Sequence, residues 1–169
     1  LRMNAGAFGQ EIAQTTVQVR GFRQDGTSFS ADRKEIHFGY RQVPDFEGVV
    51  LTSGLFHFQP TDTAVLKQRM NDILALRAKK QPLDFPSCGS VFKRPPGYYA
   101  GALIEEAGLK GEHVGGALIS PKHAGFILNT ANARAIDVLE LIRKIEEKVW
   151  QRFGVKLERE VKLIGEFDD

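Results

Sequence analysis

Ser90 stands three residues before Lys93 and four before Arg94 in the segment PSCGSVFKRPPGYYAG, residues 86–101. An arginine presents a planar fork of donors to a phosphate or a carboxylate, and a lysine presents a point charge. These residue types predict a loop that contacts an anion and aims a hydroxyl at the bound group, with Lys80 close enough in sequence to reach the same pocket. A solvated basic turn explains the same spacing, and spacing alone favours it. The pattern G-x-S-x-G is absent, so Ser90 does not stand on a nucleophile elbow.

Two carboxylates, Glu158 and Glu160, lie two positions apart in the segment 155–165. Apolar and polar residues nearly alternate along this segment, which predicts a strand with both carboxylates on the same face. A polar face exposed to solvent is the usual explanation of such a pair, and a catalytic role needs a partner from elsewhere in the chain. Arg41 follows two aromatic residues, and it is either held for carboxylate recognition or a surface side chain that extends into solvent.

The histidines and the single cysteine show no spacing typical of metal ligands, so we expect no metal site. They are His37, His57, His113, His123 and Cys88. The glycine-rich stretches VGGA and NAGAFG match neither the dinucleotide-binding fingerprint nor a phosphate-binding loop. Cys88 has no obvious base in the sequence, and we expect it to be a small buried residue.

The composition is that of an ordinary globular protein, with 42% hydrophobic and 26% charged residues in a chain of 169 residues. A formal net charge of only +2 gives no global attraction to nucleic acid or to a membrane, so any anion site is local. A single cysteine fits a reducing compartment, and no apolar run is long enough to span a bilayer. We therefore expect a cytoplasmic protein without nucleic-acid or membrane partners, and a basic nucleic-acid-binding domain is the disfavoured alternative.

Alternating and β-branched runs in the first third of the chain predict strands over 15–22, 28–31 and 48–60. The segment 61–80 then places apolar residues at helical spacing behind a Thr/Asp cap, with charges on the other face. This pattern predicts an amphipathic helix. We place a domain boundary at the change of pattern, near Pro60.

The rest of the chain predicts an α+β domain over about 61–165, followed by a tail over 166–169. Its expected helices are 100–111 and 137–154, and its expected strands are 114–120, 124–130 and 155–165. The chain opens with Leu1 in a Gly/Ala-rich stretch, LRMNAGAFGQ, and we expect that an N-terminal part is missing.

Six segments, in this order, resemble one family. They are RMNAGAFG at 2–9, FGYR at 38–41, PSCGSVFKRP at 86–95, AGALIEEAGLKG at 100–111, GGALIS with PKHAGFILN at 115–129, and LEREVKLIGEF at 157–167. The chain resembles the C-terminal part of the UDP-N-acetylenolpyruvoylglucosamine reductase (MurB) family over essentially its whole length. The short interval between Arg41 and Ser90 leaves no room for an extra tyrosine-bearing loop, so the resemblance is to the type II subclass, which lacks that loop.

The resemblance implies an NADPH-dependent, FAD-mediated reduction of UDP-GlcNAc-enolpyruvate to UDP-N-acetylmuramate, a step of peptidoglycan synthesis. It implies that residues 1–60 are the second half of a flavin-binding domain of the vanillyl-alcohol-oxidase-like kind and that 61–165 form a small substrate-binding domain. The family's flavin-phosphate loop, of the GGGSN kind, would lie N-terminal to Leu1 with the rest of the missing N-terminal part. That part is the expected partner, and the complete enzyme is an expected monomer.

The same resemblance assigns roles to single residues. The family's catalytic arginine matches Arg41, its catalytic serine matches Ser90, and its catalytic glutamate matches Glu160 rather than Glu158. The positions implied to contact the UDP diphosphate and sugar are Lys80, Lys93, Arg94 and His123, and those implied to contact FAD are Asn4 and Gly6.

Two departures bear on the substrate contacts. The family often has Asn at the position of Arg94, and the alignment around Lys80 contains a length difference. The alternative function that stays open is a non-catalytic UDP-sugar-binding fragment or split subunit of such an enzyme.

Overall fold

The structure of the protein, a computed structural model, describes residues 1–166. It divides into two compact units, unit 1 over Leu1–Thr63 and unit 2 over Ala64–Asp169. Each unit combines helical turns or helices with antiparallel sheet, which confirms the mixed α and β character predicted from the sequence. The tail predicted over 166–169 lies, from residue 167 onward, outside the described residues.

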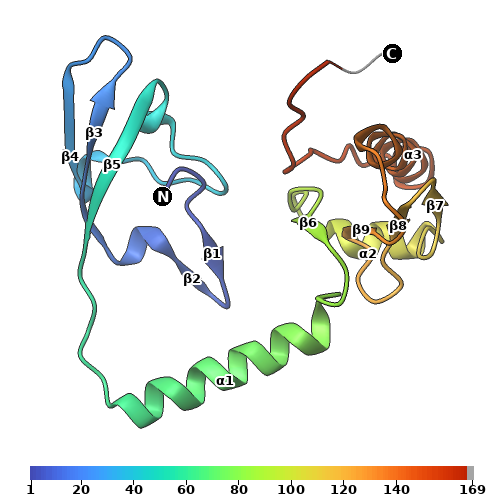
Figure 1. Cartoon of the computed structure of the whole chain (residues 1–169), viewed down its shortest axis with the longest axis horizontal. Coiled ribbons are helices and arrows are strands. Elements are labelled where there is room, and N and C mark those ends of the chain that lie inside the picture. The colour runs from blue at the N-terminus through green and yellow to red at the C-terminus, as the bar shows by residue number, and fades with distance from the viewer. Residues whose placement is uncertain (167–169) are drawn as a thin grey trace. The chain divides into compact units, whose positions relative to one another are not determined.

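Unit 1 is built around a three-stranded antiparallel sheet with the strand order β4-β3-β5 (Figure 1). Its strands are β3 over Thr16–Arg23, β4 over Ser28–Asp32 and β5 over Val49–Phe56. A short ribbon precedes the sheet, with β1 over Gly6–Ala7 and β2 over Gln10–Glu11. The three strands predicted for this part of the chain are confirmed, and the third ends four residues before Pro60.

The core of unit 1 is centred on Phe46, which is fully buried. The rings of Phe29 and Phe38 meet it edge-on, with centroids 6.2 and 6.1 Å from its own. Three single turns of 3-10 helix complete the unit, η1 over Ile12–Gln14, η2 over Arg33–Glu35 and η3 over Pro44–Phe46. Because Phe46 ends η3, this core fixes the chain directly after the segment that carries Arg41.

Unit 2 holds a four-stranded antiparallel sheet in the order β6-β9-β8-β7. The strands are β6 over Ser87–Ser90, β7 over His113–Val114, β8 over Ala117–Ile119 and β9 over Phe126–Asn129. The helices are α1 over Thr63–Lys80, α2 over Ala100–Glu106 and α3 over Ala135–Phe153. The predicted helices and the strands near 114–120 and 124–130 are confirmed, whereas β6 lies where a loop was expected.

Helix α3 supplies much of the core of unit 2. Its apolar stripe is buried against the sheet and α2, and the helix ends at Gly154, which adopts a left-handed conformation with φ of 65°. The buried residues of the stripe are Leu139, Leu141, Ile142, Ile145 and Val149. Glycine accepts this conformation without strain, which is why the sequence signal for the end of the helix was reliable.

The strand predicted over 155–165 is wrong. In place of a ladder there is one isolated bridge, between Phe92 and Arg159. The partner segment runs from Val91 directly into Pro95 and Pro96, and proline has no N–H to extend a ladder. Leu157 is buried in the core and Glu158 is exposed, but the next three residues are all half-buried and the chain bends at Glu160 and Val161, so the alternation does not continue.

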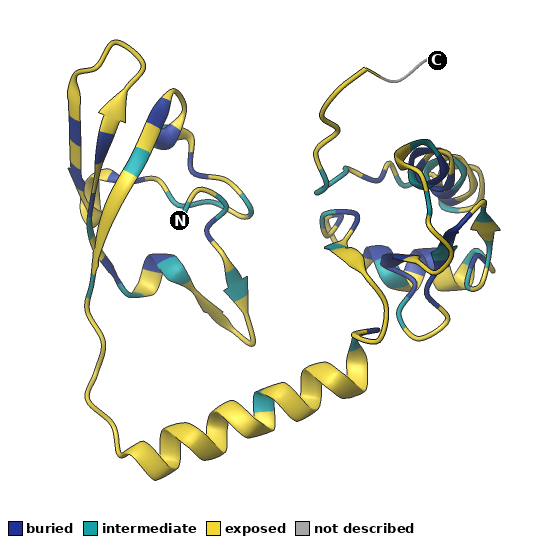
Figure 2. Ribbon diagram, in the orientation of Figure 1, coloured by how far each residue is buried: buried dark blue, intermediate teal, exposed yellow. Residues whose placement is uncertain are grey.

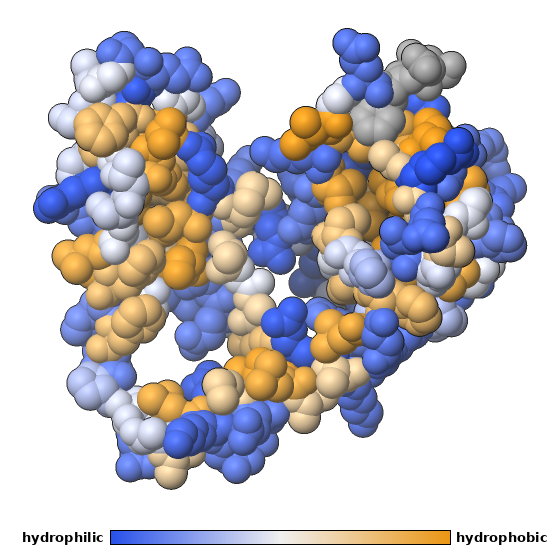
Figure 3. All heavy atoms as spheres, in the orientation of Figure 1, coloured by the Kyte–Doolittle hydropathy of each residue, from blue (hydrophilic) through white to orange (hydrophobic). Residues whose placement is uncertain are grey.

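Helix α1 is exposed along almost all of its length (Figure 2). The predicted helix is confirmed, but none of its residues is buried, and apolar side chains lie on its surface (Figure 3). The most exposed of these are Val65, Leu66, Met70 and Leu74. The helix therefore has no buried apolar face.

Three further observations concern membrane-spanning helices, metal sites and Cys88. Within residues 1–166 no helix is both long and apolar enough to cross a membrane. Over the same residues no group of three or more His, Cys, Asp or Glu side chains is arranged to hold a metal ion. Cys88 is exposed, so the prediction of a buried cysteine is wrong; it lies on β6, which is an edge strand of its sheet.

Asp137 gives unit 2 a stability that depends on pH. Its carboxylate is almost buried in the first turn of α3 and accepts hydrogen bonds from the Arg134 side chain and backbone, at 2.9 Å each for Nη2 and N. These bonds, led by that from the Arg134 side chain, lower the pKa of Asp137. We predict that Asp137→Asn destabilises the chain at pH 7 and that the difference from the parent shrinks as the pH falls through the ordinary carboxyl pKa of about 4, because the unfolded chain then takes up a proton that the folded carboxylate, with its lowered pKa, does not yet bind.

Urea unfolding followed by circular dichroism at pH 7 and at about pH 3.5 measures both differences. Glu147→Gln, an exposed change on the same helix that keeps the acceptor oxygen for Gln151, is the matched control and should leave both values unchanged. An equal loss of stability at the two pH values would show that the charge of Asp137 is not what stabilises the turn.

Candidate functional site

Ser90 is the last residue of β6 and is exposed to solvent. It pairs with Phe126 of β9, and the next residue, Val91, donates its N–H to the carbonyl of Gly125 at 3.0 Å. Gly89, directly before it, has a φ of 80°, a conformation that suits glycine, and lies within the register shift between Ser87 and Ser90. The hydroxyl of Ser90 therefore lies on an edge strand whose backbone is fixed on one side by β9.

The structure brings Glu160 beside Ser90 through the backbone. The N–H of Glu160 donates to the carbonyl of Val91 at 2.8 Å, and the N–H of Lys93 donates to the carbonyl of Glu158 at 2.8 Å. These two bonds flank the bridge between Phe92 and Arg159. Residues 70 positions apart in sequence thus lie on adjacent backbone segments, and Glu160 is half-buried there.

Lys93 and Arg94 have different surroundings. The ammonium of Lys93 forms an ion pair with the carboxylate of Glu158. The guanidinium of Arg94 lies over the ring of Tyr99, 4.1 Å from its centroid. No partner for Glu158 was evident from the sequence. In the structure its carboxylate offsets part of the positive charge that Lys93 and Arg94 place near Ser90.

His123 is held in one orientation. Its Nδ1 accepts the N–H of Gly125 at 3.1 Å, so in the neutral ring the proton is on Nε2. The loop before it is closed by the buried hydroxyl of Ser120, which accepts the N–H groups of Lys122 and His123 at 3.1 and 3.2 Å. A Cβ added to Gly101 would lie 3.0 Å from Cε1 of the His123 ring, so α2 packs against the imidazole without room for a side chain.

Lys122 is a cation that the sequence reasoning missed. Its ammonium donates to the carbonyl of Ala78 at 2.6 Å, near the end of α1. This bond brings the chain around Lys80 next to the chain around His123, and Lys80 itself is exposed. The signal available in the sequence was the position of Lys122 directly before His123 in the segment SPKHAG.

An apolar cavity of about 520 Å³ lies on the other side of β6, toward α3. Its lining is mostly aliphatic and includes Ile127, Leu128, Val138 and Val161, with Lys162 as the one charged residue that lines it. Such a lining does not suit a diphosphate, because a buried anion needs charged or hydrogen-bonding partners. The cations that could bind an anion in unit 2 therefore lie outside this cavity.

Arg41 belongs to unit 1 and is half-buried. Its φ is 56°, a left-handed conformation that is uncommon for a residue other than glycine, at the tip of a hairpin closed by Gly39 and Gln42. Its guanidinium lies 5.2 Å from the centroid of the Tyr40 ring. A strained conformation held by its surroundings is a feature that recurs at functional sites.

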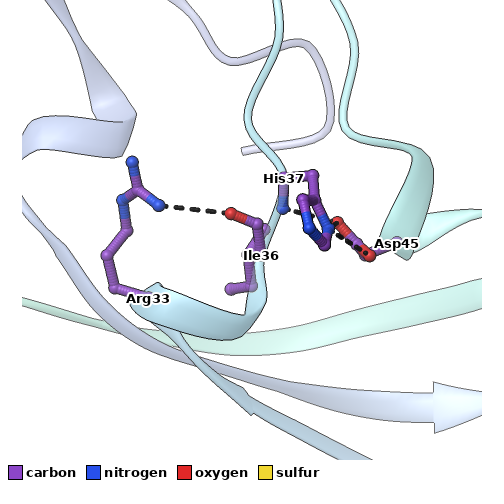
Figure 4. Close-up of polar contacts among 4 residues, drawn as sticks. All are labelled: Arg33, Ile36, His37 and Asp45. Carbon is purple, nitrogen blue, oxygen red and sulfur yellow. Dashed lines mark hydrogen bonds and ion pairs between the residues drawn. The ribbon is translucent and has the colours of Figure 1, made fainter.

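The loop that carries Arg41 is tied at its base by His37 and Asp45 (Figure 4). The backbone N–H of His37 donates to Asp45 Oδ2 at 2.6 Å, and Nδ1 lies 3.2 Å from Oδ1. These bonds, led by that from the His37 backbone, lower the pKa of Asp45. On the other side of the loop base, Arg33 Nη1 donates to the carbonyl of Ile36 at 3.2 Å.

Asn4 ties the N-terminal segment to the same loop. Its side chain is 1% exposed; Nδ2 donates to Gly39 O at 3.1 Å and to Glu11 Oε2 at 2.7 Å, and Oδ1 accepts the N–H of Ala13 at 3.3 Å. The amide that was predicted to contact FAD is thus fully occupied by protein groups. Gly6 is half-buried, and a Cβ there would meet Glu11 Cγ at 3.0 Å.

Comparisons with known proteins bear on the whole chain. Residues 81–164 match the family described as "UDP-N-acetylenolpyruvoylglucosamine reductase, C-terminal domain". Proteins named UDP-N-acetylenolpyruvoylglucosamine reductase from Pediococcus pentosaceus and Streptococcus pneumoniae (strain CGSP14) are 47% and 48% identical to it over 166 and 165 residues. Each alignment covers 97% of this chain and 55% of the relative, so the chain spans about half the length of these relatives.

A solved structure is also similar. The crystal structure of UDP-N-acetylenolpyruvylglucosamine reductase (MurB) from Thermus caldophilus matches with a TM-score of 0.80 and 36% sequence identity. The match covers 94% of this chain and 57% of that one.

We predict that Asn4→Ala weakens unit 1 locally. The change removes the hydrogen bond that Asn4 accepts from the Ala13 N–H and the one that it donates to the Gly39 carbonyl, which keeps only the long bond from the Gln42 N–H at 3.5 Å, and it places alanine at a φ of 40°. Leaving buried polar groups unpaired costs about 1–3 kcal/mol, so amide exchange in β3 and in the hairpin of Arg41 should become faster by a corresponding factor. Hydrogen exchange read by mass spectrometry measures this.

The matched control is Gln10→Ala, an exposed position on β2. Exchange in α3 of unit 2 serves as an internal reference and should not change. Unaltered exchange around Gly39 in Asn4→Ala would show that the amide does not hold the hairpin.

Proposed function

Since residues 81–164 are a C-terminal domain of the UDP-N-acetylenolpyruvoylglucosamine reductase family and the rest of the chain aligns with members of that family, we propose that this chain is the substrate-binding and catalytic part of such a reductase. The proposed reaction reduces UDP-GlcNAc-enolpyruvate to UDP-N-acetylmuramate for peptidoglycan synthesis, with NADPH as reductant and FAD as intermediate carrier. The observation that carries the proposal is the backbone pairing that puts Glu160 beside an exposed Ser90.

Ser90 is the proposed proton donor to the carbon next to the one that receives hydride. Its hydroxyl is exposed on an edge strand and therefore reachable by a ligand. A serine hydroxyl is a weak acid, so it needs hydrogen-bonding or charged neighbours, and Glu160 and Lys93 are the groups that the fold supplies. Because Lys93 is paired with Glu158, only part of its positive charge is left to act on Ser90 in this scheme.

Arg41 and Glu160 are proposed to stabilise the charge that develops on the enolpyruvyl carboxylate. An arginine fork recognises a carboxylate through two parallel hydrogen bonds, and a fixed donor lowers the barrier only where charge grows in the transition state. The left-handed conformation of Arg41 and the ties at the base of its loop favour a side chain held in advance for this task.

The UDP part of the substrate is assigned to the cations around α1 and the loop of His123. Lys80, Arg94 and His123 keep the substrate-contact roles that the family resemblance implies. The bond from Lys122 to the Ala78 carbonyl joins the segment that carries Lys80 to the one that carries His123. The Nε2–H of a neutral His123 is a donor suited to a phosphate oxygen. The apolar cavity beside β6 is left out of this assignment.

In the N-terminal segment, the residues that could contact a flavin would do so through their backbone atoms. Asn4 is engaged inside unit 1, so a contact in this segment falls to the small residues that follow it, of which Ala5 and Ala7 are exposed and Gly6 is half-buried. The absence of bulky side chains there allows a planar ring to approach the chain closely. A bound flavin would supply the hydride; the steps assigned to this chain are binding, orientation and proton donation.

We also propose that the enzyme is of the type II subclass, which lacks the extra tyrosine-bearing loop. The support is the short interval between Arg41 and Ser90, which in the structure holds η3, β5, α1 and β6 with only short connections between them. An N-terminal part like that of the longer relatives is the proposed partner of this chain, and a cytoplasmic monomer the proposed complete form.

We predict that Ser90→Ala slows flavin reoxidation by UDP-GlcNAc-enolpyruvate about 10²- to 10⁴-fold, the range expected for loss of a general acid. The assay uses a reductase that combines this chain with the N-terminal part of a relative, and stopped-flow absorbance separates the two half-reactions. Flavin reduction by NADPH should proceed at the parent rate, because Ser90 is assigned no part in it.

Cys88→Ala, an exposed side chain two residues earlier on the same strand, is the matched control and should leave both half-reactions unchanged. Reoxidation of Ser90→Ala at the parent rate would remove Ser90 as the donor. Substrate binding without reoxidation in the parent protein would favour the non-catalytic UDP-sugar-binding alternative.

We further predict that the 169-residue chain alone retains much less than one FAD per molecule. Only backbone contacts are assigned to it, and the expected phosphate-binding loop is not in its sequence. Flavin absorbance of the purified chain, compared with that of the same chain joined to the N-terminal part of a relative, measures the difference. Stoichiometric FAD on the chain alone would contradict this assignment.

A further inference from the structure

The segment 157–161 carries Glu160 but is not part of a sheet. Within residues 1–166 its backbone hydrogen bonds to the rest of unit 2 involve only Val91 and Lys93, and the carbonyl of Val91 is shared between Glu160, at 2.8 Å, and Val161, at 3.4 Å. Backbone segments with so few hydrogen bonds open easily. A side chain that must be placed accurately on such a segment needs another constraint.

Arg159 makes a contact that can supply this constraint. Its Nε donates to Glu146 Oε1 and its Nη2 to Glu146 Oε2, each at 2.6 Å. Both side chains are about one third exposed or less, at 31% and 27%. Glu146 lies on α3, the helix that forms the core of unit 2, so the fork joins the irregular segment to the most firmly packed element nearby.

This contact anchors the residue directly before Glu160. Leu157 and Val161 pack on the core, and Arg159 between them reaches α3. Glu158 is exposed and meets Lys93, and the chain bends at Glu160 and Val161. The position of Glu160 therefore depends on how firmly the neighbouring residues are anchored.

The apolar contacts of Leu157 and Val161 do not make Arg159 redundant. Hydrophobic contact is non-directional, so it sets how deeply the segment lies more than the exact position of its atoms. A bidentate arginine–carboxylate pair fixes a plane as well as a distance. Without this pair the segment keeps only its apolar contacts and its few backbone hydrogen bonds to Val91 and Lys93.

We propose that Arg159 and Glu146 are positioning residues for the reaction: their bidentate ion pair locks the segment 157–161 onto α3 and so holds Glu160 beside Ser90. The expected effect on the reaction rate rests on the function proposed above. The anchoring of the segment 157–161 involves only unit 2 and can be tested without that function. Arg159 and Glu146 touch neither substrate nor flavin in this scheme, and they act through Glu160.

The first experiment measures amide exchange on the chain itself, without flavin or substrate, in Arg159→Met and in Glu146→Gln. Protection of the Glu160 and Val161 amides should fall about tenfold or more in both variants, while the amides of α3 keep theirs. Glu146→Gln keeps the size of the side chain and serves where Arg159→Met folds poorly. The double variant that exchanges the two charges, Glu146→Arg with Arg159→Glu, should restore most of the protection.

The matched control is Glu112→Gln. It removes another ion pair of α3, between Glu112 and Lys144 at 2.5 Å, which lies away from the segment 157–161. This variant should leave the protection of Glu160 and Val161 unchanged.

The second experiment measures the two half-reactions in a reductase that contains this chain. Arg159→Met and Glu146→Gln should slow flavin reoxidation by substrate about 10²-fold, the cost of a displacement on the order of 1 Å, with flavin reduction by NADPH unchanged and with rescue in the charge-exchanged variant. Unchanged amide protection, or unchanged reoxidation in variants that have lost it, would overturn the positioning role. Inactivity of the parent protein would instead overturn the proposed function, and the exchange experiment would still decide the role of Arg159.

Discussion

One backbone junction, at Val91, holds together the parts of unit 2 that form the candidate site. Its carbonyl accepts the N–H groups of Glu160 and Val161, and its own N–H donates to Gly125. Three stretches far apart in sequence meet at this residue, which is 1% exposed. Buried backbone groups must keep their partners, so a shift of any one stretch disturbs the other two. The positions of Ser90, one residue earlier, and of the loop of His123 both depend on this junction.

Local signals in the sequence were sufficient for the elements with strong periodicity. Helix α3 has a continuous apolar stripe and a glycine stop, and β3 and β4 have alternating residues around an Asp-Gly turn, so their limits were predicted within two residues. The order of the motifs pointed to Arg41, Ser90 and Glu160 as a set. Composition and spacing alone would have left Ser90 in a basic turn, because nothing local distinguishes an anion-binding loop from a solvated one.

The rest depended on partners that a single sequence does not reveal. The alternation in 155–165 was present, but the ladder it predicted needs donors that Pro95 and Pro96 lack. Lys93 was expected to contact the UDP part of the substrate, and its pairing with Glu158 across 65 positions could not be read from either neighbourhood. The burial of Asn4 and the fork of Arg159 on Glu146 are equally non-local, since each joins segments that share no motif.

The end of α1 has a consequence for how this protein would attract an anion. A helix C-terminus carries roughly half a negative charge, which repels phosphates. Here Arg77, Lys79 and Lys80 occupy the last turn, and the ammonium of Lys122 sits on the Ala78 carbonyl. These cations first neutralise the helix terminus, and only the surplus is available to a ligand. Attraction at this end is therefore a collective field that salt weakens smoothly, rather than the property of any one lysine.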